Sequence, residues 1–181
     1  MLIREMNRTD CIDLISSGRV ARLACVKDTQ PYVIPIYFAF SDNCLYSFSM
    51  PGRKIDWMRA NPSVCVQMDE PRGHREWRSV IVDGLYEELP DTNEWRARRI
   101  QAWSLLSRHA NWWEPGGLKP GPQEIKSRSP HLYYRIRIVT ISGRHALEDD
   151  LERSIGVGDQ SASHSFLRRG MGRLLKLRGR S

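Results

Sequence analysis

A short segment that begins at Ser47 holds the residue types that bind a phosphate group. Two hydroxyls, Ser47 and Ser49, precede Gly52, which is followed at once by Arg53 and Lys54 at the start of a predicted helix. A helix start exposes free backbone N–H groups that favour anions. Two cations beside that positive dipole are unfavourable unless an anion binds, so the segment predicts a phosphate site. A solvated helix start that binds nothing would have the same residues.

An uncharged strand lies one hairpin before this segment and can hold a flat ring. Its centre is formed by Val33, Ile34, Pro35, Ile36 and Tyr37. Apolar walls with a few backbone hydrogen bonds suit a heteroaromatic ring. Proline within a strand favours an edge or bulge, where a ligand reaches the backbone. A phosphate clamp beside a dry slot is typical of a nucleotide or flavin mononucleotide (FMN) site, and plain barrel core is the alternative for this strand.

Short strands joined by tight turns must position these residues. The apolar pattern predicts six strands, over 20–26, 32–40, 44–49, 64–68, 78–88 and 132–141. It also predicts three helices: one capped by Thr9 over 10–17, one over 53–60, and one from a capping box at Asp91 and Glu94 to about 109, with Ile100, Trp103 and Leu106 as its apolar stripe. The order favours a mainly β fold with helical additions, a six-stranded antiparallel barrel.

Composition places the chain among soluble globular proteins. It has 181 residues, of which 40% are hydrophobic and 27% charged. The longest stretch without a charge, Thr29 to Ser41, has 13 residues, too few for a membrane helix. The N-terminal residues mix acids and bases where a secretory signal would be apolar. Four cysteines without a Cys-x-x-Cys pair predict buried thiols and no metal site. We therefore expect a cytoplasmic protein.

The net charge of +7 is concentrated in the C-terminal tail. The last fourteen residues carry six basic residues and no acid, whereas the rest of the chain has 22 basic and 21 acidic residues. The nearly neutral body predicts no nucleic-acid partner. We expect residues 1–147 to form the barrel domain and 148–181 a polar, basic appendage. The tail has two interpretations, an amphipathic helix that binds a membrane surface or an acidic partner, and a solvated basic tail. Gly170 and Gly172 disfavour the helix.

Five motifs in order carry a resemblance to a known family. They are Gly18-Arg-Val-Ala-Arg-Leu, Pro31-Tyr-Val-Ile-Pro-Ile-Tyr-Phe, Gly52-Arg-Lys-Ile-Asp, Asn61-Pro-Ser-Val-Cys-Val and Trp77-Arg-Ser-Val-Ile-Val-Asp-Gly. This order resembles the pyridoxamine 5′-phosphate oxidase-like family of FMN-binding split barrels, and in particular its nitroimidazole-resistance branch. The resemblance covers about residues 12–88, with a weaker echo in 133–144.

The resemblance implies a homodimer of split barrels with FMN in a cleft between the subunits. The family's phosphate-binding pair falls on Arg53 and Lys54, and its hydroxyl-bearing strand end falls on 47–49, with Ser49 preferred. The segment along the flavin ring falls on 33–37. A polar contact from a later strand falls on Ser79, and the neighbouring Arg78 either reaches the phosphate or is exposed.

The departures from the family limit the reaction. The chain lacks the C-terminal Trp-, Arg- and His-rich segment of true pyridoxamine phosphate oxidases, and no charged residue lies in its ring-lining strand. The resemblance therefore implies a flavin-dependent oxidoreductase that reduces a small organic electrophile, such as a nitro compound, with NADH or NADPH as an electron source. The alternative on the same fold is a non-catalytic carrier or sensor of flavin or heme.

Overall fold

One antiparallel sheet with three helices makes up the described part of the chain. The computed structural model describes residues 2–73, 75–108 and 131–147. Its elements in chain order are β1 (Leu2–Glu5), α1 (Arg8–Ser17), β2 (Val20–Lys27), β3 (Gln30–Tyr37), β4 (Ala39–Ser41), β5 (Cys44–Ser49), α2 (Arg53–Ala60), β6 (Ser63–Pro71), β7 (Trp77–Leu89), α3 (Arg96–Ser107) and β8 (Leu132–Leu147). No helix among these residues is long and apolar enough to cross a bilayer.

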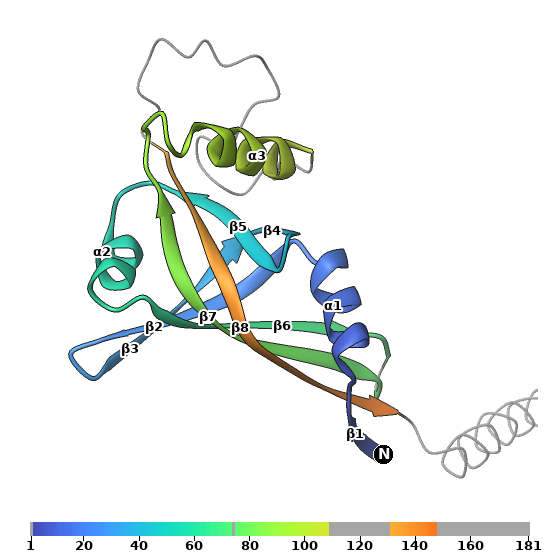
Figure 1. The fold of residues 1–181 in the computed structure, drawn as a ribbon. Coiled ribbons are helices and arrows are strands. Elements are labelled where there is room, and N and C mark those ends of the chain that lie inside the picture. The colour runs from blue at the N-terminus through green and yellow to red at the C-terminus, as the bar shows by residue number, and fades with distance from the viewer. Residues whose placement is uncertain (1, 74, 109–130, 148–181) are drawn as a thin grey trace, which may run out of the picture.

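The sheet curls into a barrel that stays open along one line. Its strand order is β3-β2-β6-β7-β8-β5-β4, and β1 adds to β8. The strands at the two ends of this order, β3 and β4, are consecutive in the chain and separated by Phe38 alone, so the sheet must bend back on itself (Figure 1). The predicted mainly β, antiparallel split barrel is therefore confirmed.

The interior of the barrel takes every second side chain of its strands. This first core also receives the apolar faces of α1 and α2. Its fully buried members include Leu14, Ile15, Leu23, Ile36, Ile55, Met58, Val66, Val80 and Val82. Because α2 packs into this core with Ile55 and Met58, the positions of Arg53 and Lys54 at its start are fixed relative to β2 and β3.

A second core lies under α3, at the end of the sheet away from the β2–β3 turn (Figure 1). Ala102 and Leu106 of α3 pack there against Tyr46, Phe48 and Tyr133 of the sheet. Of the stripe predicted for this helix, Leu106 is buried and Trp103 is partly buried, but Ile100 is 56% exposed. The prediction for Ile100 was wrong, because the sheet contacts Ala102 and Leu106 instead.

Several predicted boundaries differ from the structure. Eight strands are present among the described residues instead of the predicted six, because β1 is additional and the strand predicted over 32–40 divides into β3 and β4 at Phe38. Asn7 rather than Thr9 caps α1, with its side chain accepting the Asp10 N–H at 2.9 Å. The third helix starts at Arg96, without the predicted cap. The bounds 53–60 of α2 are as predicted.

The cysteines behave as small core residues. Cys11, Cys25 and Cys44 are buried and Cys65 is half-buried, and all four are free thiols. Burial raises the pKa of each of these thiols. The predicted appendage over 148–181, with its basic tail, lies outside the described residues.

Candidate functional site

The start of α2 leaves the backbone open to approach. Gly52 adopts φ 158° and ψ −173° and caps the helix without a side-chain hydrogen bond. Its carbonyl accepts the N–H groups of Ile55 and Asp56 at 3.0 and 3.1 Å. Outside Gly52 and its two chain neighbours, no heavy atom lies within 4 Å of the position that a Cβ would take on Gly52. The space over Gly52 is therefore open at the point where the sequence predicts a phosphate.

The guanidinium of Arg53 lies against two aromatic rings. Its Cζ is 4.6 Å from the ring centroid of Tyr32 on β3 and 4.4 Å from that of Trp57, one turn later on α2. Arg53 is exposed to solvent, and within 2–73, 75–108 and 131–147 no carboxylate forms an ion pair with it. The cation therefore keeps its charge available beside β3.

Lys54 starts a different face of α2. One residue along an α-helix is a rotation of about 100°, so Lys54 does not share the face of Arg53 and Trp57. It lies one turn before the buried Met58 and is half-buried. The two predicted cations thus spread around the helix start, with Arg53 toward β3.

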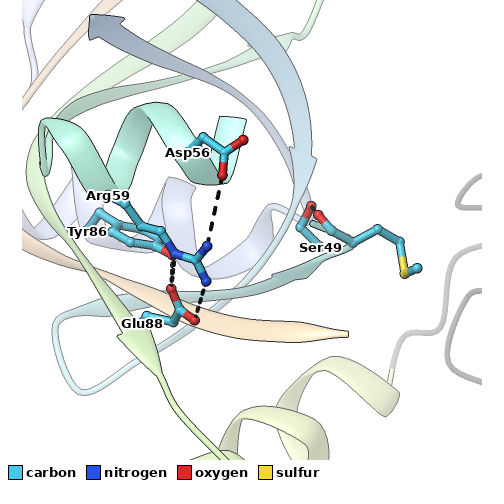
Figure 2. A network of polar contacts seen from close by, with 6 residues as sticks. Ser49, Asp56, Arg59, Tyr86 and Glu88 are labelled. Atoms are coloured by element: carbon cyan, nitrogen blue, oxygen red, sulfur yellow. Dashed lines mark hydrogen bonds and ion pairs between the residues drawn. The ribbon is translucent and has the colours of Figure 1, made fainter. Parts of the chain in front are cut away.

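The two serines of β5 bond to backbone carbonyls. Ser47 is 1% exposed, and its hydroxyl donates to the Tyr37 carbonyl of β3 at 2.7 Å. This bond joins β3 and β5 where the barrel closes. Ser49, two residues nearer to α2, donates to the carbonyl of Met50 at 2.7 Å (Figure 2). A hydroxyl must donate a hydrogen bond to bind a phosphate oxygen. Ser49 would therefore have to give up its hydrogen bond to the Met50 carbonyl, and Ser47 would have to give up the hydrogen bond that joins β3 to β5.

The outer edge of β3 carries few hydrogen-bond donors. A two-residue turn at Asp28 and Thr29, both with positive φ, joins β2 to β3, so Lys27 and Gln30 form the first hydrogen-bonded pair. From Gln30 onward, every second residue of β3 exchanges backbone hydrogen bonds with β2. The hydrogen bond from the Phe38 N–H to the Arg19 carbonyl, 2.9 Å long, fits this alternation.

The residues between these pairs direct their backbone away from β2. They are Pro31, Val33, Pro35 and Tyr37. Both prolines lack an N–H, so Val33 supplies the edge donor over residues 31–36. Val33 is also 59% exposed, whereas Ile34 and Ile36 turn into the first core. Of the predicted ring-lining residues, Val33 and Pro35 are thus the accessible ones.

We call the line along which β3 faces residues 47–54 the seam. Its closed end is the bond between Ser47 and Tyr37, and its open end is the contact between Arg53 and Tyr32. The structure brings nine predicted site residues to this line: Val33, Ile34, Pro35, Ile36, Tyr37, Ser47, Ser49, Arg53 and Lys54.

Ser79 lies away from the seam of its own chain. It pairs with Asp69 of β6, and its hydroxyl accepts from Gln67 at 3.2 Å. Val64 of β6 pairs with Cys25, which in turn pairs with Tyr32, so Val64 is level with the Tyr32 end of the seam. Asp69 lies five residues further along β6, and at 3.3–3.4 Å per residue this places Ser79 about 17 Å along the strand from that level. Arg78 is held by Glu70 at 2.8 Å, which favours a structural role over phosphate contact.

Sequence reasoning missed an ion pair that holds the other end of α2. Arg59 makes two hydrogen bonds of 2.8 Å to the Glu88 carboxylate of β7, and Asp56 lies 3.9 Å from Arg59 (Figure 2). The Tyr86 hydroxyl donates to the same carboxylate at 3.0 Å. These bonds hold the pKa of Glu88 below its usual value, while burial raises that of Tyr86. No local pattern predicts this pair, because its partners lie 29 residues apart.

Comparisons with known proteins agree with this fold. The pyridoxamine 5′-phosphate oxidase family model matches residues 7–145. An uncharacterized protein of Rhizobium meliloti strain 1021 is 50% identical over 151 residues, which cover 83% of this chain and all of that protein. The crystal structure of an FAD-binding protein of Mesorhizobium loti is 52% identical with a TM-score of 0.70, and the match covers 81% of this chain and all of that one.

A more distant structure shares the fold alone. It is assigned to 5-nitroimidazole antibiotic resistance in Bacteroides thetaiotaomicron, is 17% identical with a TM-score of 0.57, and the match covers 82% of this chain and 93% of that one. The family model and the half-identical relatives each cover most of the chain, and the residues 7–145 of the family model include both strands of the seam and α2. The chain belongs to the pyridoxamine 5′-phosphate oxidase family.

Proposed function

We propose that this chain binds the riboflavin 5′-phosphate unit that FMN and FAD share. The observation that carries the proposal is Arg53, an exposed cation held beside the edge of β3 with no carboxylate partner in the described residues. The half-identical protein of Mesorhizobium loti binds FAD, which supports a flavin. The sequence favoured FMN, and the relative adds FAD as a ligand to be tested.

Each part of the seam would hold one part of the ligand. Arg53, Lys54 and the backbone of the first turn of α2 would bind the phosphate, because a charge-assisted hydrogen bond contributes about 1.5–3 kcal/mol. Val33 and Pro35 would contact the ring, and the Val33 N–H would donate to a ring acceptor. Ser49 would join the phosphate site by turning its hydroxyl from the Met50 carbonyl.

We propose a flavin-dependent oxidoreductase that reduces a small organic electrophile, such as a nitro compound. The bound flavin would supply hydride and single-electron chemistry, with NADH or NADPH as a candidate reductant. The chain would orient the ring and exclude water from one side of it with apolar side chains of β3. A flavin or heme carrier without turnover is the alternative, and it is favoured by the absence of a titratable side chain from residues 31–36 of β3 other than the Tyr32 phenol.

A homodimer would complete the site. Among the described residues, no helix covers the outer face of β2, β3, β6 and β7, because α1 and α2 pack on the inner face. Exposed apolar side chains on this outer face include Val20, Val26, Val33 and Ile81. A second copy packed on this face would bury them. It would also explain Ser79, which is far from the seam of its own chain and could reach the seam of a partner.

The colour of the purified protein tests flavin binding. We expect absorption near about 450 nm, which is a property of flavins. The double variant Arg53→Ala Lys54→Ala should bind FMN more than about 100-fold more weakly, as two charge-assisted contacts are lost, and should purify colourless. Arg4→Ala Arg137→Ala removes the same charge from exposed positions elsewhere and should stay yellow. Full flavin occupancy in the first variant would refute the phosphate assignment.

A turnover assay separates the enzyme from the carrier. Under anaerobic conditions, NADH or NADPH should bleach the bound flavin, and a nitro compound should then restore its colour. A flavin that these nucleotides leave oxidised, or that no electrophile reoxidises, would favour the carrier.

A further inference from the structure

Arg53 sits in an angle between two aromatic rings rather than on one surface. The ring centroids of Tyr32 and Trp57 are 5.5 Å apart, with 61° between their planes. Each centroid is also within 5 Å of the Arg53 guanidinium carbon. The guanidinium carbon is closer to each centroid than the two centroids are to each other, so one guanidinium contacts both rings. Two rings fix the direction of the side chain more closely than one ring would.

The two rings come from different elements and are themselves held by the core. Trp57 follows Arg53 by four residues on α2, the spacing that places side chains on one helix face. Tyr32 belongs to the inward-facing set of β3 and pairs with Cys25 of β2. Both rings are partly buried and pack against the first core. A long exposed side chain is therefore held against anchored rings before any ligand binds.

This arrangement suits an anion better than it suits the fold alone. A cation attracted by the faces of aromatic rings keeps its N–H groups for acceptors that lie in the guanidinium plane. The Arg53 charge also reaches into β2, where it partly offsets the rise that burial causes in the pKa of Cys25. Arg59, six residues later, has its guanidinium N–H groups occupied by the carboxylate of Glu88 instead.

We propose that Tyr32 and Trp57 are positioning residues that orient Arg53 toward the phosphoryl group of the flavin. This inference rests on the proposed function, and it adds two residues that the sequence analysis did not assign to the site. The rings would act through Arg53 alone. They would therefore change the affinity for a phosphorylated flavin and leave the affinity for riboflavin, which lacks the phosphate, almost unchanged.

The test compares the dissociation constants of FMN, FAD and riboflavin by quenching of flavin fluorescence. In Trp57→Leu and in Tyr32→Leu, we expect the preference for FMN over riboflavin to fall about 2- to 5-fold, the size of a cation–π interaction at an exposed site. Trp57→Phe and Tyr32→Phe keep a ring and should restore most of the preference. Trp95→Leu removes a half-buried tryptophan at the second core and should leave the preference unchanged.

A double-mutant cycle separates positioning from packing. In the Arg53→Ala background, Trp57→Leu should cause no further loss of FMN preference, because the ring then has nothing to orient. Equal losses in both backgrounds, or equal losses of FMN and riboflavin affinity, would overturn the proposal. If Trp57→Leu fails to fold, the Tyr32 variants and the Phe variants give the same comparison.

The outcomes also separate this inference from the function on which it rests. Wild-type protein that binds no flavin would refute the proposed function itself. Wild-type protein that prefers FMN to riboflavin, with Leu variants that keep the whole preference, would refute the positioning role alone and leave the flavin site standing.

Discussion

The two ends of α2 hold two arginines in opposite electrostatic states. Arg59 is paired through two hydrogen bonds with Glu88 and lies 3.9 Å from Asp56. Arg53 lies on aromatic rings and has no carboxylate partner among the described residues. Six residues of one helix thus separate a cation that is paired within the fold from a cation that we propose binds a phosphate. The proposal rests on the partners of each charge and not on the charge alone.

Reversal of the charge at Arg53 should give the largest effect. Arg53→Glu removes the contact with the phosphate and adds repulsion, so we expect FMN affinity to fall about 1,000-fold, the sum of a lost charged hydrogen bond and a like-charge contact. The free energy of unfolding of the apo protein should change by less than about 1 kcal/mol, since the lost cation–π contacts are exposed. Titration with FMN and urea unfolding measure the two quantities. A variant that unfolds more easily but binds FMN normally would reverse the roles assigned to the two arginines.

Truncation at Arg59 should give the opposite pattern. Arg59→Ala leaves the Glu88 carboxylate without its cation, and the apo protein should lose about 1–2 kcal/mol of unfolding free energy after allowance for the exposure of Arg59. The FMN-to-riboflavin affinity ratio should stay within about twofold of wild type, a shift of about 0.4 kcal/mol. Urea unfolding and fluorescence titration provide the measurements. An unchanged unfolding curve would show that this ion pair does not anchor α2.

Removal of one backbone N–H from β3 should distinguish contacts to the flavin ring from contacts to the phosphate. Val33→Pro deletes the edge donor without loss of a bond to β2, because Val33 faces the open edge as Pro31 and Pro35 do. We expect FMN and riboflavin to lose affinity equally, by about 5- to 10-fold, the value of one neutral hydrogen bond. Val33→Ala keeps the N–H and is the matched control. A loss confined to FMN would contradict the assignment of this edge to the ring.

Acid should give the smallest effect, a loss of the stabilisation that the Arg59–Glu88 ion pair contributes to the fold. Arg59 and Tyr86 hold the pKa of Glu88 below its ordinary value of 4.5. The stabilisation is therefore complete above that ordinary value and is lost as the pH falls through the lower pKa of the folded state. Between pH 7 and pH 3, the gap in urea midpoint between wild type and Glu88→Gln should narrow. A constant gap would mean that Glu88 does not titrate with folding.

Residues that start or end helices and strands made much of the fold predictable. Gly52 and the Asn61-Pro62 pair delimit α2, and its bounds agree with the prediction. β1 was not predictable in this way, because its four residues are all exposed and it forms only by pairing with β8, which is distant in the sequence. Asn7 rather than Thr9 caps α1, because the helix starts at Arg8.

The proximity of the two predicted segments could be inferred from the sequence, but the partners of their side chains could not. The phosphate-type segment and the ring-type strand do lie along one seam, as their order in the sequence indicated. The hydroxyl of Ser47, by contrast, is used to close the barrel, which depends on where β3 and β5 meet. The contact of Arg53 with Tyr32 joins residues 21 positions apart, and no periodicity reports such a contact.

The most direct test is the FMN-to-riboflavin affinity ratio of two matched variants, Arg53→Ala and Arg59→Ala. The substitution is the same, the helix is the same, and both residues are exposed. We predict that the preference for FMN falls at least 10-fold in Arg53→Ala, the loss of one charge-assisted contact, and is retained in Arg59→Ala. Equal ratios in the two variants would contradict the assignment of the phosphate to the start of α2.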